Sequence, residues 1–308
     1  MPTSWSSIKS RSIGAPGELL VVMDTQLQHS QVKKMIADFA NEEFPCIPQP
    51  EATFKLSNIK PNDFEGHFKA YRNIIIIRQK KIKNTNIRYK KNVWATHQQL
   101  IEIDIPNIAS FSTAFEEHRT RIFNFLYEGD IKTMQLANQK GADQKLSHYI
   151  HKKYGINMAL PKGFKLMKDT ADFCWFTFDR LATSTHIVIQ SFNIKNLSSI
   201  NNEYLVYLRD SIGKAFIPGP SELSYMQTEK RLPVMAKNKQ INNMNITEIR
   251  GLWKVEGFFM GGPFVNYFIR DKAHDRLLMI DGFIYAPQKQ NKAHYVRQME
   301  SILRSVKI

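Results

Sequence analysis

Asn73-Ile74-Ile75-Ile76-Ile77-Arg78 places four consecutive isoleucines between polar residues. A continuous run of β-branched aliphatic residues between polar ones predicts a core strand. Upstream, the apolar residues from Glu18 to Asp24 predict another buried strand, and His29 to Phe44 shows apolar residues at helical spacing. Downstream, Leu100 to Ile105 alternates between apolar and acidic residues. Together with the run at 73–78, this alternation predicts an antiparallel meander.

From Ser110 onward, the sequence predicts a long helical segment followed by further strands and helices. Ser110 to Tyr154 has the periodicity of a long helical connector, with a break near Gly141. Further strands are predicted at 172–179, 185–192, 251–257, 263–270 and 277–285, and helices at 204–216 and 293–306. Residues 218–245 show little periodicity and are expected to form a long irregular excursion.

A chain of 308 residues favours two domains, because single cores rarely grow beyond about 250–300 residues. We therefore expect an α+β fold of two parts, with mainly antiparallel sheets flanked by helices. The predicted parts are a polar lead (1–13), an N-terminal α+β domain with the helical connector (14–154) and a C-terminal α+β sandwich domain (155–308).

Composition limits the classes of protein. The 43 Lys and Arg residues outnumber the 28 Asp and Glu residues, which gives a net charge of +15 and predicts attraction to polyanions. The two cysteines, Cys46 and Cys174, are too few for a disulfide scaffold and wrongly spaced for a zinc site. A single disulfide between them in an oxidising compartment is the alternative to two free thiols. No apolar run is long enough to span a membrane, and residues 1–12 contain no apolar signal core.

Much of the positive charge lies in one acid-free stretch, which makes it the candidate anion-binding segment. Its candidate residues are Lys80, Lys81, Lys83, Arg88, Lys90 and Lys91. Interleaved with Tyr89 and Trp94, these cations have the composition of a single-strand nucleic-acid site. An exposed hairpin with lysines along its edge is the favoured interpretation, and nucleic acid is not the expected partner.

Signals for catalysis and cofactors are weak. Gly14-Ala15-Pro16-Gly17 precedes a strand, whereas a phosphate-binding loop follows one. The sequence contains no hydrolase elbow and no His-Glu-x-x-His motif. We therefore assign no catalytic residue, no metal and no cofactor. Acids such as Asp24, Glu229 or Asp281 would serve the alternative function, a hydrolase or transferase acting on an envelope polymer in an interdomain cleft.

Several phrases together resemble one family. They are Gly17–Asp24, Tyr71–Ile77, Pro218–Ser221, Ser224–Met226, Arg250–Trp253, Met260–Val265 and Gly282–Pro287. They resemble, from about Gly14 to the end of the chain, the Bacteroidetes lipoprotein family catalogued as domain of unknown function 4837. The C-terminal half is also similar to PsbP-like α/β/α sandwiches, through Leu160–Phe164 and the final helix.

The lipoprotein resemblance implies a location in the cell envelope, facing the periplasm, with a lipid anchor at the N-terminus of the full-length protein; the alternative is the cytoplasm. With no catalytic motif, it favours a non-enzymatic module that binds a protein, an anionic glycan or an anionic lipid. The candidate partner surface consists of Tyr225, Arg250, Trp253, Gly261, Gly262 and Phe264, residues of kinds that anchor interfaces. A packing role for these residues is the other interpretation.

Overall fold

The structure is a computed structural model that describes residues 9–193 and 200–308. The chain divides into two compact units. The first unit runs to Glu43 and resumes from Ala52 to Thr133, and the second contains 44–51 and 134–308. Helix α3 (Ile108–Lys140) contributes to both units. The boundary therefore lies inside a helix, where the sequence gives no break in periodicity to mark it.

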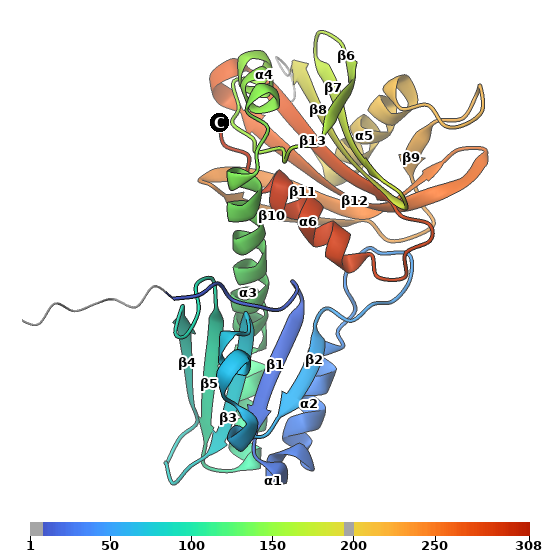
Figure 1. Cartoon of the computed structure of the whole chain (residues 1–308). Coiled ribbons are helices and arrows are strands. Elements are labelled where there is room, and N and C mark those ends of the chain that lie inside the picture. Colours follow the sequence, from blue (N-terminus) through green and yellow to red (C-terminus); the bar gives the residue numbers. More distant parts are fainter. Residues whose placement is uncertain (1–8, 194–199) are drawn as a thin grey trace, which may run out of the picture. The chain divides into compact units, whose positions relative to one another are not determined.

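The first unit is built on a five-stranded sheet in the order β2-β1-β3-β5-β4 (Figure 1). Before α3, its elements are β1 (Glu18–Met23), α1 (Thr25–Gln28), α2 (Gln31–Ala40), β2 (Lys55–Ile59), η1 (Pro61–Asp63), η2 (Gly66–Ala70), β3 (Asn73–Gln79), β4 (Asn86–Lys91) and β5 (Gln99–Ile105). Strand β1 pairs in parallel with β2 and β3, β3 pairs in parallel with β5, and β4 is antiparallel to β5. The predicted antiparallel meander is thus wrong for β3 and β5. Strands buried on both faces, as β3 is, are typical of parallel sheets.

The two faces of this sheet are covered differently. Helices α2 and α3 cover one face, where residues such as Val21, Ile75 and Phe115 form the main core. On the opposite face, a smaller apolar cluster contains Leu20, Val22, Ile74, Ile76 and Leu100, with Phe64, Phe68 and Tyr71 packed against it. Along β3 and β5, this second face continues into charged side chains, Arg78 on β3 and Glu102 and Asp104 on β5.

Part of the predicted polar lead is joined to the first unit. The backbone N–H of Ile13 donates to the carbonyl of Ala70 (2.8 Å), and that of Ser12 donates to the carbonyl of Thr96 (3.0 Å). Residues 9–13 therefore pack with the domain. Residues 1–8 of the lead lie outside the described residues.

The second unit contains an eight-stranded sheet. After α3 its elements are α4 (Gln144–Tyr154), β6 (Lys165–Asp169), β7 (Phe173–Arg180), β8 (Thr183–Asn193), α5 (Asn202–Phe216), β9 (Met226–Thr228), β10 (Met235–Ile241), β11 (Met244–Val255), β12 (Phe258–Asp271), η3 (Lys272–His274), β13 (Arg276–Tyr285) and α6 (Ala293–Leu303). The main path is β10-β11-β12-β13-β8-β7-β6, every neighbouring pair along it is antiparallel, and β9 pairs with β11.

Helices cover both faces of this sheet (Figure 1). On β13, Asp281 contacts Arg209 of α5, whereas a Cβ on the next residue, Gly282, would meet Met299 and Leu303 of α6. Successive strand residues point to opposite faces, so α5 and α6 lie on opposite sides of the sheet. The α+β class with mainly antiparallel strands is thereby confirmed.

Two predicted segments differ from the structure. Helix α4 was assigned to the N-terminal part, but it belongs to the second unit, where the hydroxyl of Tyr154 donates to the carbonyl of Ile189 in β8 (3.2 Å). The irregular excursion over 218–245 is wrong for β10, which pairs with β11 from Met235–Arg250 to Ile241–Met244. An edge strand with lysines lacks the apolar alternation by which strands are recognised.

Among the described residues, no helix is long and apolar enough to cross a membrane.

Candidate functional site

Charged side chains converge on the open face of the first unit's sheet. Arg78 comes from β3, and its Nε donates to Oδ1 of Asp104 (2.9 Å) while Nη2 donates to Oε1 of Glu102 (3.0 Å). Both carboxylates belong to β5, which lies between β3 and β4. One guanidinium therefore bridges two carboxylates that are two residues apart on the same strand face.

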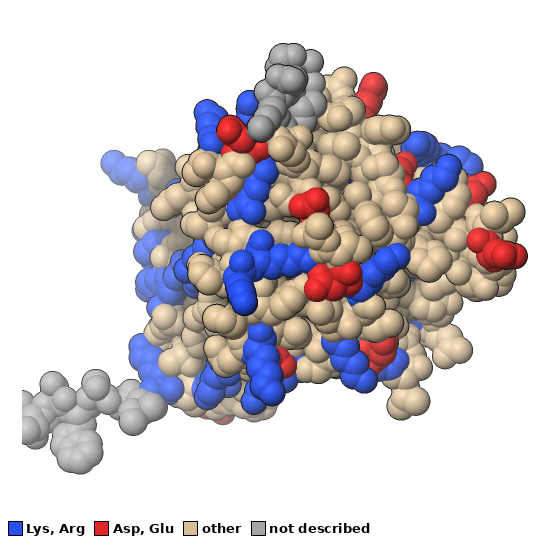
Figure 2. All heavy atoms as spheres, turned by 90° about the horizontal axis from the view of Figure 1, so that it is seen from above, with Lys and Arg blue, Asp and Glu red and all other residues tan. Residues whose placement is uncertain are grey.

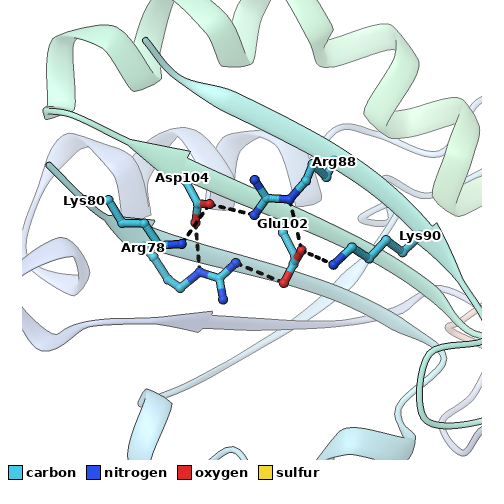
Figure 3. Close-up of polar contacts among 6 residues, drawn as sticks. All are labelled: Arg78, Lys80, Arg88, Lys90, Glu102 and Asp104. Atoms are coloured by element: carbon cyan, nitrogen blue, oxygen red, sulfur yellow. Dashed lines mark hydrogen bonds and ion pairs between the residues drawn. The ribbon is translucent and has the colours of Figure 1, made fainter. Parts of the chain in front are cut away.

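Three further cations reach the same two carboxylates (Figure 3). Arg88 of β4 approaches Oδ2 of Asp104 at 2.6 Å, and Lys80, just after β3, approaches the same oxygen at 3.0 Å. Lys90 of β4 lies 2.6 Å from Oε2 of Glu102. We call this cluster the charged face; it consists of Arg78, Lys80, Arg88, Lys90, Glu102 and Asp104. Four cations against two carboxylates leave the cluster with an excess positive charge.

The carboxylates of the charged face are held in the ionised form. Burial alone would raise the pKa of Asp104, but hydrogen bonds from Arg88, Lys80 and Arg78 outweigh it and lower the pKa to about 2. The pKa of Glu102 is lowered in the same way, since hydrogen bonds from Lys90, Arg78 and Arg88 outweigh burial. Both groups therefore keep the four cations in fixed positions at neutral pH.

A hollow lies beside the charged face. It has a volume of about 490 Å³ and is lined by Gln79, Lys80, Lys81, Ile82, Lys83 and Pro106. We call it the lysine pocket. Lys81 and Lys83 lie on the β3–β4 loop, exposed to solvent, and among the described ion pairs neither has a carboxylate partner. The pocket thus adds two lysines to the cation excess of the charged face.

The candidate anion-binding residues do not all gather at one place. Lys80, Arg88 and Lys90 join the charged face, and Lys81 and Lys83 line the lysine pocket. Lys91 does not join them, because its Nζ lies over the ring of Phe125, 5.7 Å from the centroid, on the face covered by α3. It is a correction to the predicted set.

The two aromatic residues of the same stretch are also placed away from the charged face. Tyr89 packs against Phe125 of α3, with Arg121 over its ring. Trp94 packs edge-on against Phe64. Neither ring stands beside the cations as a stacking platform, so the structure gives no support to the single-strand nucleic-acid interpretation.

The candidate partner surface is largely interior. Arg250 is buried beneath α6, where its Nε donates to Glu248 (2.7 Å) and its Nη2 pairs with Glu300 (2.6 Å). Trp253 and Phe264 are also buried, and the indole N–H of Trp253 donates to the carbonyl of Ile284 (3.1 Å). For these three residues the packing interpretation replaces the surface one.

The glycines and the tyrosine of that candidate surface have packing roles as well. A Cβ on Gly262 would lie 2.1 Å from the carbonyl oxygen of Ile284, and one on Gly261 would lie 2.5 Å from that of Trp253. Strand β12 therefore needs glycine for close approach to its neighbours. Tyr225 is half-buried with Lys214 over its ring. One edge of the region, including Trp253, Gly261 and Gly262, borders an apolar groove of about 410 Å³.

The acids of the alternative enzyme have different surroundings within their own units. Asp281 is fully buried and pairs with Arg209 at 3.1 Å; burial raises its pKa despite the guanidinium. Hydrogen bonds from Arg231 lower the pKa of Glu229 to about 2. Asp24 is exposed at the start of α1 and makes no capping hydrogen bond with its side chain. No group of three metal-binding side chains occurs among the described residues.

Both cysteines are free thiols. Cys174 is fully buried, as its apolar neighbours indicate, and the hydroxyl of Tyr149 lies 3.1 Å from its sulfur.

Comparison with known families covers nearly the whole chain. A family model described as Domain of unknown function (DUF4837) matches residues 143–305. The chain belongs to this family. A second model, Domain of unknown function (DUF8532), matches residues 12–139. The first match is shorter than the resemblance implied, because the phrases at Gly17–Asp24 and Tyr71–Ile77 lie in the range of the second model.

Matches to individual proteins are distant. No curated protein matches the sequence. The Saccharomyces cerevisiae Ran-binding protein Mog1p has a similar structure at 10% identity and a TM-score of 0.33, over 50% of this chain and 92% of that chain. A mutant of protein Mog1 matches at 11% identity and a TM-score of 0.32, with the same coverage. The PsbP-like resemblance of the C-terminal half stays a prediction.

The charged face and the buried ion cluster fall under different family models. The charged face lies within the range of DUF8532, and Glu248, Arg250 and Glu300 lie within that of DUF4837.

Sequence reasoning missed Arg78, Glu102 and Asp104 as members of the charged face. The pairing register brings them together: Glu102 lies opposite Arg88 of β4, and Asp104 lies opposite Arg78 of β3.

The net charge of the chain is not confined to the charged face. On the side of the molecule shown in Figure 2, lysine and arginine are spread widely, with carboxylates between them. What distinguishes the charged face is the ordered arrangement of its cations, not their number.

Proposed function

We propose that this chain is a non-enzymatic binding module of the cell envelope that holds an anionic envelope component on the charged face and lysine pocket of its first unit. The observation that carries the proposal is the surplus of positioned cations, four around Glu102 and Asp104 with Lys81 and Lys83 beside them. Phosphate or carboxylate groups of a glycan or lipid have the chemistry that such cations bind.

The exposure of the cations supports this proposal. The side chains of Arg78, Lys80, Arg88 and Lys90 keep between 34% and 45% of their surface accessible. Their carboxylate partners are buried, so an incoming anion meets the cations first. Because Glu102 and Asp104 already fix the cations, little side-chain entropy is lost when an anion binds.

Retention on immobilised heparin, a sulfated glycan, tests the proposal. We expect the full chain to be retained, and the double variant Lys81→Glu/Lys83→Glu to bind about tenfold more weakly. The matched control is Lys33→Glu/Lys34→Glu, two exposed lysines of α2, which covers the opposite face of the sheet. Both variants change the net charge by the same amount. Equal weakening in both would overturn the proposal, because net charge alone would then explain retention.

The envelope location and the lipid anchor rest on the lipoprotein resemblance. Their test is the reading frame upstream of Met1. A hydrophobic segment followed by a cysteine would support a lipid-anchored, periplasm-facing protein. A native start at Met1 would overturn that location.

A further inference from the structure

An exposed apolar tip stands at one end of the second unit's sheet. Phe259 is 107% exposed and Phe258 is 52% exposed, immediately after the Glu256-Gly257 turn that joins β11 to β12. Leu223, on the preceding loop, is 90% exposed. The N–H of Glu256 donates to the carbonyl of Tyr225 (2.9 Å), which holds this loop beside the hairpin. Figure 1 shows both loops projecting at the same end of the sheet. We call Leu223, Phe258 and Phe259 the apolar tip.

The groove of about 410 Å³ lies directly beside this tip, and Phe258 and Phe259 form part of its lining. Most of its other lining residues are apolar, among them Leu232, Trp253, Met260 and Tyr285. A convex apolar feature and a concave apolar feature therefore lie next to each other on one surface. Large exposed apolar groups with a groove at their side mark a surface that another molecule covers.

Most charges around the apolar tip are paired, although the chain carries +15; the exception is Lys292 of the groove, whose Nζ donates to Gln49 and to the carbonyl of Lys289. Lys230 pairs with Asp210 (3.1 Å), Arg231 with Glu229 (2.6 Å) and Lys254 with Glu256 (3.0 Å). Lys214, near the end of helix α5, and Glu222, on the loop that carries Leu223, are exposed. An anionic bilayer or polymer would be attracted to a local excess of cations, which the tip lacks and the charged face has.

We propose that the apolar tip and groove pair with the same surface of a second copy of this chain about a two-fold axis. A two-fold interface brings one patch against itself, so the patch must carry both a projection and a recess, and must not repel itself. The adjacent tip and groove meet the first requirement. The balanced ion pairs meet the second, since two copies would otherwise repel through their positive charge. Phe259 of each copy enters the groove of the other.

The mass of the full chain in solution, measured by light scattering or sedimentation over a range of concentrations, tests this pairing. We expect the mass to rise from 35.8 kDa towards twice that value with concentration. Phe259→Ser should weaken the dimer about tenfold or more, because an interface phenylalanine would lose its burial. The side chain of Phe259 is fully exposed and does not pack in the core, so we expect the variant to keep its fold. Circular dichroism checks this.

A matched control is Met167→Ser. Met167 is 57% exposed on β6, the strand at the other edge of the sheet from β10, and its loss should leave the dimer constant unchanged. A mass of 35.8 kDa at every concentration, or equal dimers with Ser at position 259, would overturn the pairing. Binding of monomers to neutral phosphatidylcholine vesicles, lost in Phe259→Ser, would overturn it in favour of a lipid surface.

Discussion

In the first unit, the four cations around Glu102 and Asp104 keep between 34% and 45% of their side-chain surface in solvent. In the second unit, Arg250 keeps 8% and Arg209 keeps 1%. The same residue types form networks of similar geometry in both. The two networks differ in solvent exposure. The cations of the first unit stay accessible to an external anion, whereas those of the second unit hold α5 and α6 against the sheet. A charged network therefore indicates a binding surface when its cations remain accessible.

The largest expected effect on stability comes from breaking the buried ion pair between Arg209 and Asp281. Asp281→Ala would leave Arg209 buried without its carboxylate and should lower the free energy of unfolding by about 3–5 kcal/mol. Asp104→Ala, in the accessible cluster, should cost only about 1 kcal/mol, because solvent screens the cations it leaves behind. Urea denaturation of both variants measures the difference. Equal losses would remove the distinction between the two units.

A half-buried histidine, His186, makes the stability depend on pH. Burial lowers the pKa of His186 to about 4, although Asp179 opposes the shift, and the indole N–H of Trp175 donates to its Nδ1 (3.2 Å). The unfolded chain binds this proton near pH 6.5 and the folded chain only near pH 4, so stability is full above pH 6.5 and is lost as the pH falls to 4. The loss should be on the order of 3 kcal/mol over that window.

His186→Gln keeps an acceptor for Trp175 but cannot be protonated. We expect thermal unfolding of this variant to lose a large part of the pH dependence between pH 7 and pH 5.5, roughly the range above carboxylate titration; the remainder belongs to groups such as His294, whose pKa burial also lowers. An unchanged slope would mean that His186 is not the group responsible.

The smallest expected effect on stability comes from changing a carboxylate within the charged face. Glu102→Gln removes one of the two carboxylates while keeping the shape of the side chain, so stability should fall by no more than about 1 kcal/mol. Heparin retention should increase, because Arg78, Arg88 and Lys90 lose a competitor. Decreased retention would show that Glu102 positions the cations more than it competes for them.

Much of the fold could be predicted from the sequence. The runs at Glu18–Met23 and Asn73–Gln79 are strands, and the connector is two helices broken at Gly141. Such elements have strong local signals, namely β-branched runs and apolar residues every three to four positions. Parallel pairing of β3 with β5 was missed, because the direction of a neighbour is decided by tertiary packing rather than by the strand's own residues.

The candidate sites were less accessible to sequence reasoning. Arginine is rarely buried, so Arg250 was expected at a surface; its burial depends on Glu300, fifty residues away in α6. The basic stretch was correctly read as cationic, but its partners Glu102 and Asp104 come from another strand. Phe258 and Phe259 lie between the predicted strands 251–257 and 263–270 and were given no role, because exposure at a hairpin tip depends on where the turn falls.

Amide hydrogen exchange with and without a heparin oligosaccharide locates the anion-binding surface on the chain. If the anion binds the charged face and lysine pocket, exchange will be slower in residues 78–91 and 99–106, the segments that form them. Exchange in β11 and α6, around Arg250 and Glu300, should not change. Protection confined to the second unit, with none in residues 78–106, would mean that the anion does not bind the charged face.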